Sequence, residues 1–297
     1  MNRLDSAKRS LIVKMITEGN SLRAASRIAN VSINTVTKLV CELGEACIVY
    51  HDQHVTNLRC ERVEMDEIWS FVGHKNKGKV DQSQVIHNPT EGDVWTWKCI
   101  CAESKLIVGW HVGGRTFDNA VTFCREVAPR FAEMPQISTD GLKSYPMAIG
   151  YAFGSDVHYG RLIKIYGKDK DGKEVCVGAR KERVYGAPEM GNTCTSFIER
   201  SNLTLRMSNR RFARRTNAHS KKIENHELAL GLHFFVYNFC RKHLSLKQTP
   251  AMAAGVTDHV WSIDDLLSMF DAYMAENYPA ERPKTYKPRA PKDEISN

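Results

Sequence analysis

The stretch Arg62–Val72, RVEMDEIWSFV, decides the fold of this 297-residue chain. It is rich in β-branched and aromatic residues, and its pattern predicts a strand. Asp66 and Glu67 lie in its middle and should point to opposite faces. A carboxylate in the centre of an apolar strand is costly unless it is paired or holds a cation. Asp66 is therefore a candidate metal ligand, whereas Glu67 has a simpler interpretation as a solvated side chain on the other face.

The segments after this strand predict the rest of a sheet. Two strands and an amphipathic helix follow it, over Val94–Ala102, Leu106–Val112 and Phe117–Phe131. A fourth, short strand, Gln136–Thr139, then ends on Asp140. A three-stranded meander, a helix and a fourth strand is the order of the ribonuclease-H-like fold, an α/β fold with a mixed sheet flanked by helices. In that order the first and fourth strands are neighbours, so Asp66 and Asp140 are expected to converge.

A third acidic residue, Glu199, opens the basic segment Thr195–Arg215, TSFIERSNLTLRMSNRRFARR. Read as a helix, this segment places Glu199, Asn202, Leu203, Arg206 and Arg210 on one face. An isolated glutamate there is explained by ordinary ion pairs, but two further candidate acids make it a possible third ligand. The dense basic run beside it predicts contacts with DNA phosphates. The candidate residues are Arg200, Asn202, Arg206, Arg210, Arg211, Arg214 and Arg215.

Residues 1–45 predict a DNA-binding domain of three short helices, Ser6–Thr17, Ser21–Ala29 and Ile33–Leu43. The tight turn at Asn30-Val31 and the small residues of the second helix are typical of a helix-turn-helix. On this interpretation Asn34, Thr35, Thr37 and Lys38 face a major groove. A generic three-helix cap is the alternative. Residues 46–60 are interpreted as a linker to a catalytic domain over 61–255.

Three segments complete the predicted organisation. Residues 160–188 form a hairpin-like insert, whose lysines and arginines either lie along DNA phosphates or are simply solvated. Ile223–Leu244 is predicted to be one long helix, and residues 256–278 hold a last amphipathic helix, Ser262–Asn277. The charged, proline-rich tail 279–297 has little to bury and is expected to be disordered.

Composition limits the class of protein. The formal charge is +8, which makes a polyanion a plausible partner. The nine cysteines include no Cys-x-x-Cys pair, so zinc-finger spacing is absent and reduced thiols in a cytosol are expected. The sequence has neither a signal-peptide pattern nor an apolar run long enough to span a bilayer. These features predict a cytoplasmic protein, associated with the nucleoid when bound to DNA, and no membrane partner.

Three motifs carry a resemblance to a known family. MDEIWSFV at 65–72, STDGLKSY at 138–145 and FIERSNLTLRMSNRRFARRT at 197–216 resemble the acidic motifs of DDE transposases, most closely those of the IS-one insertion-sequence family. The resemblance implies that Asp66, Asp140 and Glu199 are catalytic carboxylates and metal ligands for two Mg²⁺ ions, with Mn²⁺ able to substitute. It also implies a homo-oligomer that acts on double-stranded DNA, at terminal inverted repeats and at a target.

The chain departs from that family in two ways. It lacks the cysteine-rich zinc-binding segment that commonly begins members of the family, and Glu199 follows Asp140 by as many as 59 positions. The implied chemistry is an in-line displacement at phosphorus by water, for end cleavage, and then by a 3′-hydroxyl, for strand transfer. The alternatives are a domesticated or inactive transposase-derived DNA-binding protein, and a nuclease of the same fold.

Overall fold

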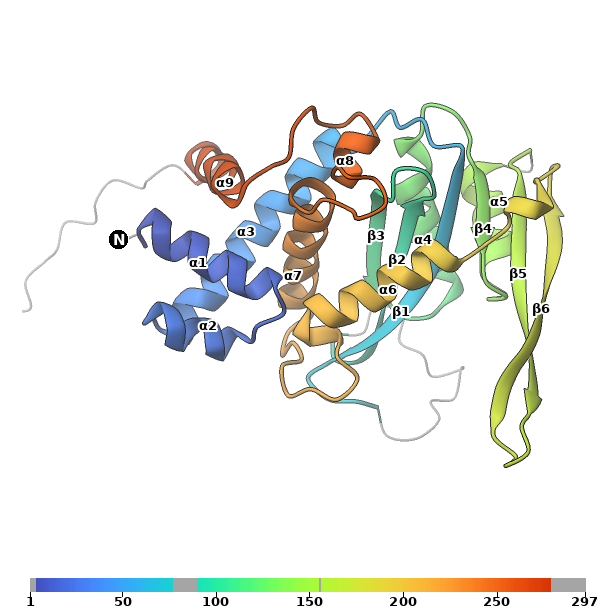
Figure 1. Ribbon diagram of the computed structural model, residues 1–297, viewed down its shortest axis with the longest axis horizontal. Coiled ribbons are helices and arrows are strands. Elements are labelled where there is room, and N and C mark those ends of the chain that lie inside the picture. Colours follow the sequence, from blue (N-terminus) through green and yellow to red (C-terminus); the bar gives the residue numbers. More distant parts are fainter. Residues whose placement is uncertain (1–3, 77–89, 155, 279–297) are drawn as a thin grey trace, which may run out of the picture.

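The structure is a computed structural model that describes residues 4–76, 90–154 and 156–278. A helical head, a sheet covered by helices and a protruding β-hairpin follow one another along its longest axis (Figure 1). Within the described ranges, no helix has both the length and the apolar character needed to cross a membrane. All nine cysteines are free thiols. The predicted disordered tail, 279–297, lies outside the described residues.

Three helices form the head, at the positions that the sequence predicts. They are α1 (Ser6–Thr17), α2 (Leu22–Ala29) and α3, which begins at Ile33. Hydroxyl caps set two of the starts, because Ser21 Oγ accepts the N–H of Ala24 and Ser32 Oγ accepts the N–H of Thr35. Asn30, with φ at 51°, ends α2 in the left-handed region. The short connection between α2 and α3 therefore follows from its sequence.

Six strands form one mixed sheet in the order β3-β2-β1-β4-β5-β6. Their bounds are β1 (Arg62–Val72), β2 (Gly92–Cys101), β3 (Ile107–Gly113), β4 (Gln136–Thr139), β5 (Tyr159–Lys168) and β6 (Glu174–Tyr185). The first three strands are antiparallel neighbours, whereas β4 pairs in parallel with both β1 and β5. This is the ribonuclease-H-like order, so the predicted fold class is confirmed. The predicted pairing of the first and fourth strands is also present.

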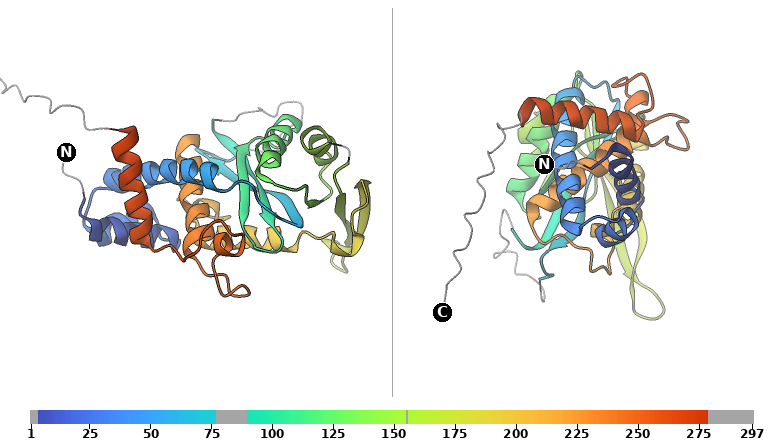
Figure 2. Two further views of the ribbon diagram at one scale, coloured as in Figure 1. Left: turned by 90° about the horizontal axis from the view of Figure 1, so that it is seen from above. Right: turned by 90° about the vertical axis from the view of Figure 1, so that its left-hand side faces the viewer.

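Helices cover both faces of the sheet (Figure 2). One face carries α4 (Phe117–Val127) with its following 3₁₀ turn (Ala128–Arg130), and α5 (Tyr145–Phe153); the other carries α6 (Ser196–Ser208). The alternation of β1 explains the two layers, because successive side chains of a strand point to opposite faces. Met65 packs in one buried cluster with Phe123, and Ile68 packs in the other with Leu205 of α6.

The predicted hairpin consists of β5 and β6, joined by a turn over residues 169–173. Asp169 shapes this turn, since its Oδ1 accepts the N–H groups of Asp171 and Lys173, each at 2.9 Å. Only Tyr159–Arg161 of β5 pairs with β4, because β4 is four residues long. The rest of the hairpin therefore extends beyond the sheet (Figure 1).

The third helix of the head is longer than predicted. It runs over Ile33–His54 and does not end at Leu43. Residues 46–54 of the predicted linker are its last turns, so that part of the linker prediction is wrong. The buried face of the helix continues past Leu43, since Cys47, one turn further along, is fully buried. The partner of this extended helix is α7 (Ile223–Phe235).

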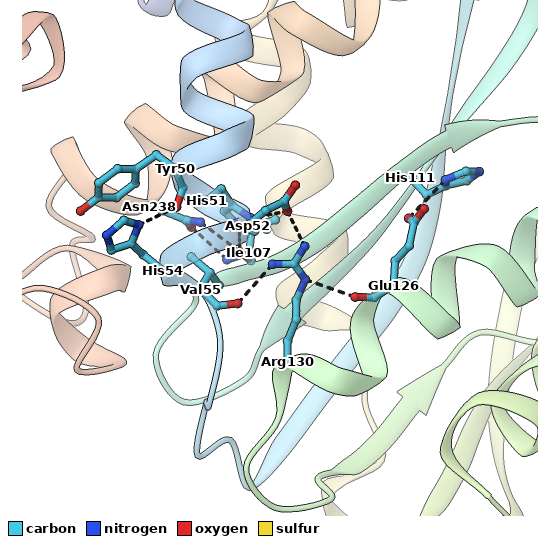
Figure 3. A network of polar contacts seen from close by, with 10 residues as sticks. All are labelled: Tyr50, His51, Asp52, His54, Val55, Ile107, His111, Glu126, Arg130 and Asn238. Carbon is cyan, nitrogen blue, oxygen red and sulfur yellow. Dashed lines mark hydrogen bonds and ion pairs between the residues drawn. The ribbon is translucent and has the colours of Figure 1, made fainter. Parts of the chain in front are cut away.

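A polar network fastens the end of α3 to the body (Figure 3). His51 Nε2 donates to the carbonyl of Ile107 on β3 at 3.2 Å. Asn238 bonds the N–H and the carbonyl of the same Ile107, each at 2.9 Å. Arg130, after α4, donates to the carboxylate of Asp52. The head is therefore built into the packing of the body.

The C-terminal helices also differ from the prediction. The predicted long helix Ile223–Leu244 is α-helical only to Phe235, where a π-helical turn (Val236–Cys240) replaces it and ends the helix. The short α8 (Pro250–Ala253) follows. The last helix, α9 (Ile263–Asn277), is as predicted and starts at a capping box of Ser262 and Asp265. An ion pair of 2.6 Å between Arg9 and Asp271 joins α1 to α9.

Glycine allows α3 and α7 to approach closely. A Cβ added at Gly44 would lie 2.0 Å from the carbonyl oxygen of Leu228, and one added at Gly231 would lie 2.5 Å from Ile48 Cγ1. We expect Gly44→Ala to lower the free energy of unfolding by about 1–3 kcal/mol, as overpacked cores do. Helix propensity alone would stabilise the variant by roughly 1 kcal/mol, so the sign of the change is diagnostic.

Urea unfolding of the full chain measures this change. The matched control is Gly178→Ala in β6, where an added Cβ meets nothing within 4 Å and a change within about 0.5 kcal/mol is expected. A Gly44→Ala variant as stable as the wild type would contradict the close crossing of α3 and α7.

Candidate active site

Two neighbouring strands bring a pair of carboxylates together. In the parallel register of β1 and β4, Met65 lies opposite Thr139. Asp66 and Asp140 directly follow these residues, one inside β1 and the other just past the end of β4. One oxygen each of Asp66, Asp140 and Glu67 lies within 4.8 Å of the others. The predicted convergence of Asp66 and Asp140 is therefore present in the structure.

The electrostatics of this cluster favour a cation. Burial, together with the charges of Asp140 and Glu199, raises the pKa of Asp66 to about 6. Burial, together with Asp140 and Asp66, raises the pKa of Glu67 to about 8. Carboxylates that repel one another in a poorly solvated site gain most from a divalent cation, and carboxylate oxygens are the ligands that Mg²⁺ prefers. The cluster of acids is therefore able to bind a metal ion.

Glu67 is not a solvated side chain, so its simpler interpretation is wrong. Its side chain is 1% exposed and forms an ion pair of 2.6 Å with Arg115. The hydroxyl of Tyr145 donates to its other oxygen at 3.2 Å. The opposite face of β1 is covered by α4 and α5, and this cover buries a residue that an exposed sheet face would leave in water. Arg115 and Tyr145 thus each hold one carboxylate oxygen of Glu67, next to the two aspartates.

The structure does not gather Glu199 with the other two predicted acids. Glu199 lies in the first turn of α6, and its Oε1 accepts from Lys164 Nζ at 2.8 Å and from Thr195 Oγ1 at 2.9 Å. Lys164 belongs to β5, so the hairpin holds this carboxylate. Glu199 acts on the cluster through its charge, which contributes to the raised pKa of Asp66.

A buried lysine faces Asp66 from the neighbouring strand. Lys98 pairs with Asp66 in the register of β1 and β2, is fully buried, and donates to Ser201 Oγ on α6 at 3.0 Å. Burial lowers the pKa of Lys98 to about 7, while the charge of Asp66 opposes this shift. Sequence reasoning missed this residue. Its signal was a single lysine inside the apolar run VWTWKCICA, the same kind of signal that identified Asp66.

Two acids of β1 hold α6 on the sheet. Glu64 accepts the N–H of Ile198 at 2.8 Å, in the first turn of α6, where unpaired N–H groups favour a carboxylate. Asn202 Nδ2, one turn along, donates to Asp66 Oδ2 at 2.7 Å. Asn202 was predicted to contact DNA, but its side chain is buried and directed at Asp66. Glu64 was not singled out in the sequence, although it precedes Asp66 by two residues and so shares its face.

The basic segment is only partly helical. The predicted face that extended to Arg210 is wrong, because α6 ends at Ser208 and Arg210 begins a separate 3₁₀ turn (Arg210–Phe212). Ser208 directs its hydroxyl back to the carbonyl of Thr204 at the end of the helix. Of the predicted phosphate contacts, Arg206 and Arg211 are partly covered; the exposed ones are Arg200, Arg210, Arg214 and Arg215.

The predicted groove-facing residues of the head lie at the start of α3. Asn34 and Lys38 are exposed. Thr35 Oγ1 lies 3.1 Å from Ser32 Oγ, and Thr37 Oγ1 donates to the carbonyl of Ile33 at 2.9 Å. The two threonines thus bond within their own helix start. Two exposed side chains on one helical turn remain consistent with the predicted role, which stays a prediction.

Comparison with known proteins finds a similar insertion-element protein. No family model matches the chain. The iso-IS1n insertion-element protein InsB of Shigella dysenteriae is 27% identical over 182 residues, which cover 61% of this chain and 95% of that protein. The chain is therefore similar to insertion-element transposases of the IS1 type. The three acidic motifs resemble the same family.

Solved transposase structures also resemble the chain. A piggyBac transposase synaptic complex with hairpin DNA has a TM-score of 0.44 at 9% identity, covering 95% of this chain and 75% of that one. A Mos1 mariner paired-end complex with Mn has a TM-score of 0.26 at 9% identity, covering 79% of this chain and 76% of that one.

The buried position of Glu64 predicts a pH dependence of stability. Burial raises the pKa of Glu64 from 4.5 to about 7, so the folded protein binds this proton more tightly than the unfolded chain does. The contribution of Glu64 to the free energy of unfolding is fully present below its pKa in the unfolded chain. It is lost as the pH rises through about 7, the pKa in the folded protein. Between about pH 4.5 and pH 8, we expect the free energy of unfolding of the wild type to fall by up to about 3 kcal/mol more than that of Glu64→Gln.

Urea unfolding at both pH values, with EDTA present, measures the effect. Glu61→Gln, at an exposed position just before β1, is the matched control and should follow the wild type. If Glu64→Gln loses as much stability as the wild type over the same interval, the buried placement of Glu64 is contradicted.

Proposed function

We propose that this transposase binds the terminal inverted repeats of its insertion sequence and catalyses metal-dependent cleavage and strand transfer of the DNA ends. The observation that carries the proposal is the convergence of Asp66 and Asp140 at the β1–β4 junction, where burial and the charge of Asp140 raise the pKa of Asp66 to about 6. These are the carboxylates of the first two acidic motifs of the DDE pattern.

Asp66 and Asp140 would hold a divalent cation, Mg²⁺ or Mn²⁺. When bound in pairs, such ions stabilise the entering and leaving oxygens of an in-line displacement at phosphorus. Both carboxylates are already oriented by the protein. Asp66 accepts from Asn202 at 2.7 Å, and Asp140 Oδ1 accepts the N–H of Leu142 at 2.9 Å. Lys98 and Arg115 offset part of the negative charge beneath the site.

Glu199 completes the proposed set of ligands. It sits on the same helix as Asn202, one turn nearer to the hairpin, and its charge already reaches Asp66. Its partner Lys164 is 38% exposed on β5, where the phosphates of bound DNA would compete for it. Glu67 is a poorer third ligand, because Arg115 and Tyr145 already bond its two oxygens.

The arginines supply the proposed contacts with DNA phosphates. Arg200, Arg206, Arg210, Arg211, Arg214 and Arg215 lie in or directly after α6, on the sheet face that carries Asp66. The exposed start of α3, with Asn34 and Lys38, is the proposed reading surface for the inverted repeat. Since transposition must bring two element ends together, we also propose a homo-oligomer of at least two protomers.

Replacing the proposed ligands tests this function. We expect Asp66→Asn, Asp140→Asn and Glu199→Gln each to lower Mg²⁺-dependent cleavage and strand transfer by more than about 100-fold, the upper range for groups that merely support a ligand. Binding of a labelled terminal repeat should be largely retained, because none of the three is a proposed DNA contact. The assay pairs that labelled repeat with a target plasmid.

Asp258→Asn is the matched control, since Asp258 is 97% exposed and remote from the cluster, and it should keep full activity. Retained strand transfer in Asp66→Asn or Asp140→Asn would overturn the proposal. Cleavage without joining in the wild type would favour a nuclease of the same fold. Binding of the repeat with neither reaction would favour a domesticated DNA-binding protein.

A further inference from the structure

A groove of about 860 Å³ lies between the head and the segment that follows α6. The head contributes the turn between α1 and α2, the start of α2, with Arg23, and the start of α3, with Ile33 and Thr37. The other wall is formed by residues 208–221 and by α7. The walls are close, since a Cβ added at Gly19 would lie 2.9 Å from the carbonyl oxygen of Met207. Figure 1 shows the end of α6 beside α2 and α7.

The charge of this groove has one sign. Five of its lining residues are cations: Arg23, Arg210, Arg211, Arg215 and Lys221. Among the residues that the structure describes, neither aspartate nor glutamate lines the groove. Within the described ranges of the chain, no ion pair to a carboxylate is formed by any of these five side chains. Cations gathered from two distant parts of the sequence repel one another, so this arrangement is unfavourable without an anion.

Unpaired donors point to the same kind of ligand. Arg211 Nε is buried and makes no hydrogen bond in the described structure, and burial lowers the pKa of Arg211. A guanidinium can only donate, and a buried donor without a partner costs about 1–3 kcal/mol. Ser220 Oγ and His219 Nδ1, which also line the groove, are likewise buried and unbonded among the described residues. The groove therefore lacks an acceptor, and a phosphate has the charge and oxygens to supply one.

We infer that this groove binds one sugar–phosphate backbone of the DNA, with Arg211 and its neighbours around a phosphate. The inference rests on the proposed function and adds a defined path to it. One end of the groove reaches the start of α3, the proposed reading surface. The lining also includes Ser208, which lies six residues and about 9 Å along α6 from Asn202, the residue that bonds Asp66. The groove thus links the DNA-reading and metal-binding ends of the protein.

The salt dependence of DNA binding tests this path. The probe is a labelled random-sequence duplex of about 30 base pairs, bound to the full chain and followed by anisotropy over a range of NaCl concentrations. The variants are Arg23→Ala in the head, Arg215→Ala in the opposite wall, and both together. Each lost phosphate contact should lower the slope of log K against log salt by about 0.9 and the affinity near 0.1 M salt by about eightfold. The double variant should lower the slope by about twice as much as either single variant does.

Arg125→Ala is the matched control, because Arg125 is exposed on α4, on the opposite face of the sheet from α6. It changes the net charge equally and should leave the slope within error of the wild type. Arg211→Lys keeps the charge but removes the planar fork, and should weaken binding while its melting temperature stays near that of the wild type. Arg215→Lys should retain the wild-type slope.

The groove inference is overturned if Arg23→Ala and Arg215→Ala bind DNA with the wild-type slope of log K against log salt. It is also overturned if Arg125→Ala lowers that slope as much as they do. Stabilisation by inorganic phosphate with unchanged DNA binding would make this a small-anion site and would also overturn it. Either result, together with Asp66-dependent strand transfer, leaves the proposed metal-dependent cleavage and strand transfer intact. Strand transfer that survives Asp66→Asn would refute the proposed function, whatever the slopes show.

Discussion

The parallel pairing of β1 with the four-residue strand β4 is the constraint on which the rest of the site depends. It places Asp66 beside Asp140 and stacks three carboxylates in a poorly solvated space. Such repulsion is unfavourable, and the surrounding residues offset it: Lys98 from β2, Arg115 beneath Glu67, and Asn202 from α6. The raised pKa values of Asp66 and Glu67 show that this compensation is incomplete. The remaining imbalance favours the binding of a cation by the cluster.

Helix α6 connects β1, one strand of that pair, with the head of the molecule. Glu64 binds its first turn and Asp66 binds Asn202, so the helix is fixed by the same strand that carries the site. Its far end then meets the head, where the segment after Ser208 forms one wall of the cationic groove. The head is joined to the body, because α3 packs on α7 through Gly44 and Gly231. The proposed reading surface and the acids are thus parts of one packed frame.

Local signals predicted much of this frame. The alternation in RVEMDEIWSFV, the short strand ending on Asp140 and the serine caps of the head act over a few residues, and each is present. The errors concern contacts between distant segments. Nothing within 46–60 shows that α7 and β3 extend α3 to His54, and nothing beside Glu199 shows that Lys164 of the hairpin holds it. Lys98 was visible as a charge in an apolar strand, but its role follows only from its register opposite Asp66.

The central claim is that Asp66 and Asp140 share a divalent ion, and iron-directed cleavage of the backbone tests it most directly. Fe²⁺ replaces Mg²⁺ on the full chain, and ascorbate with hydrogen peroxide then generates hydroxyl radicals at the bound ion, which cut the chain nearby. We expect fragments that end close to residues 66 and 140, that are suppressed by excess Mg²⁺ and that are absent from Asp66→Asn. Cleavage elsewhere, or the same fragments from Asp66→Asn, would contradict it.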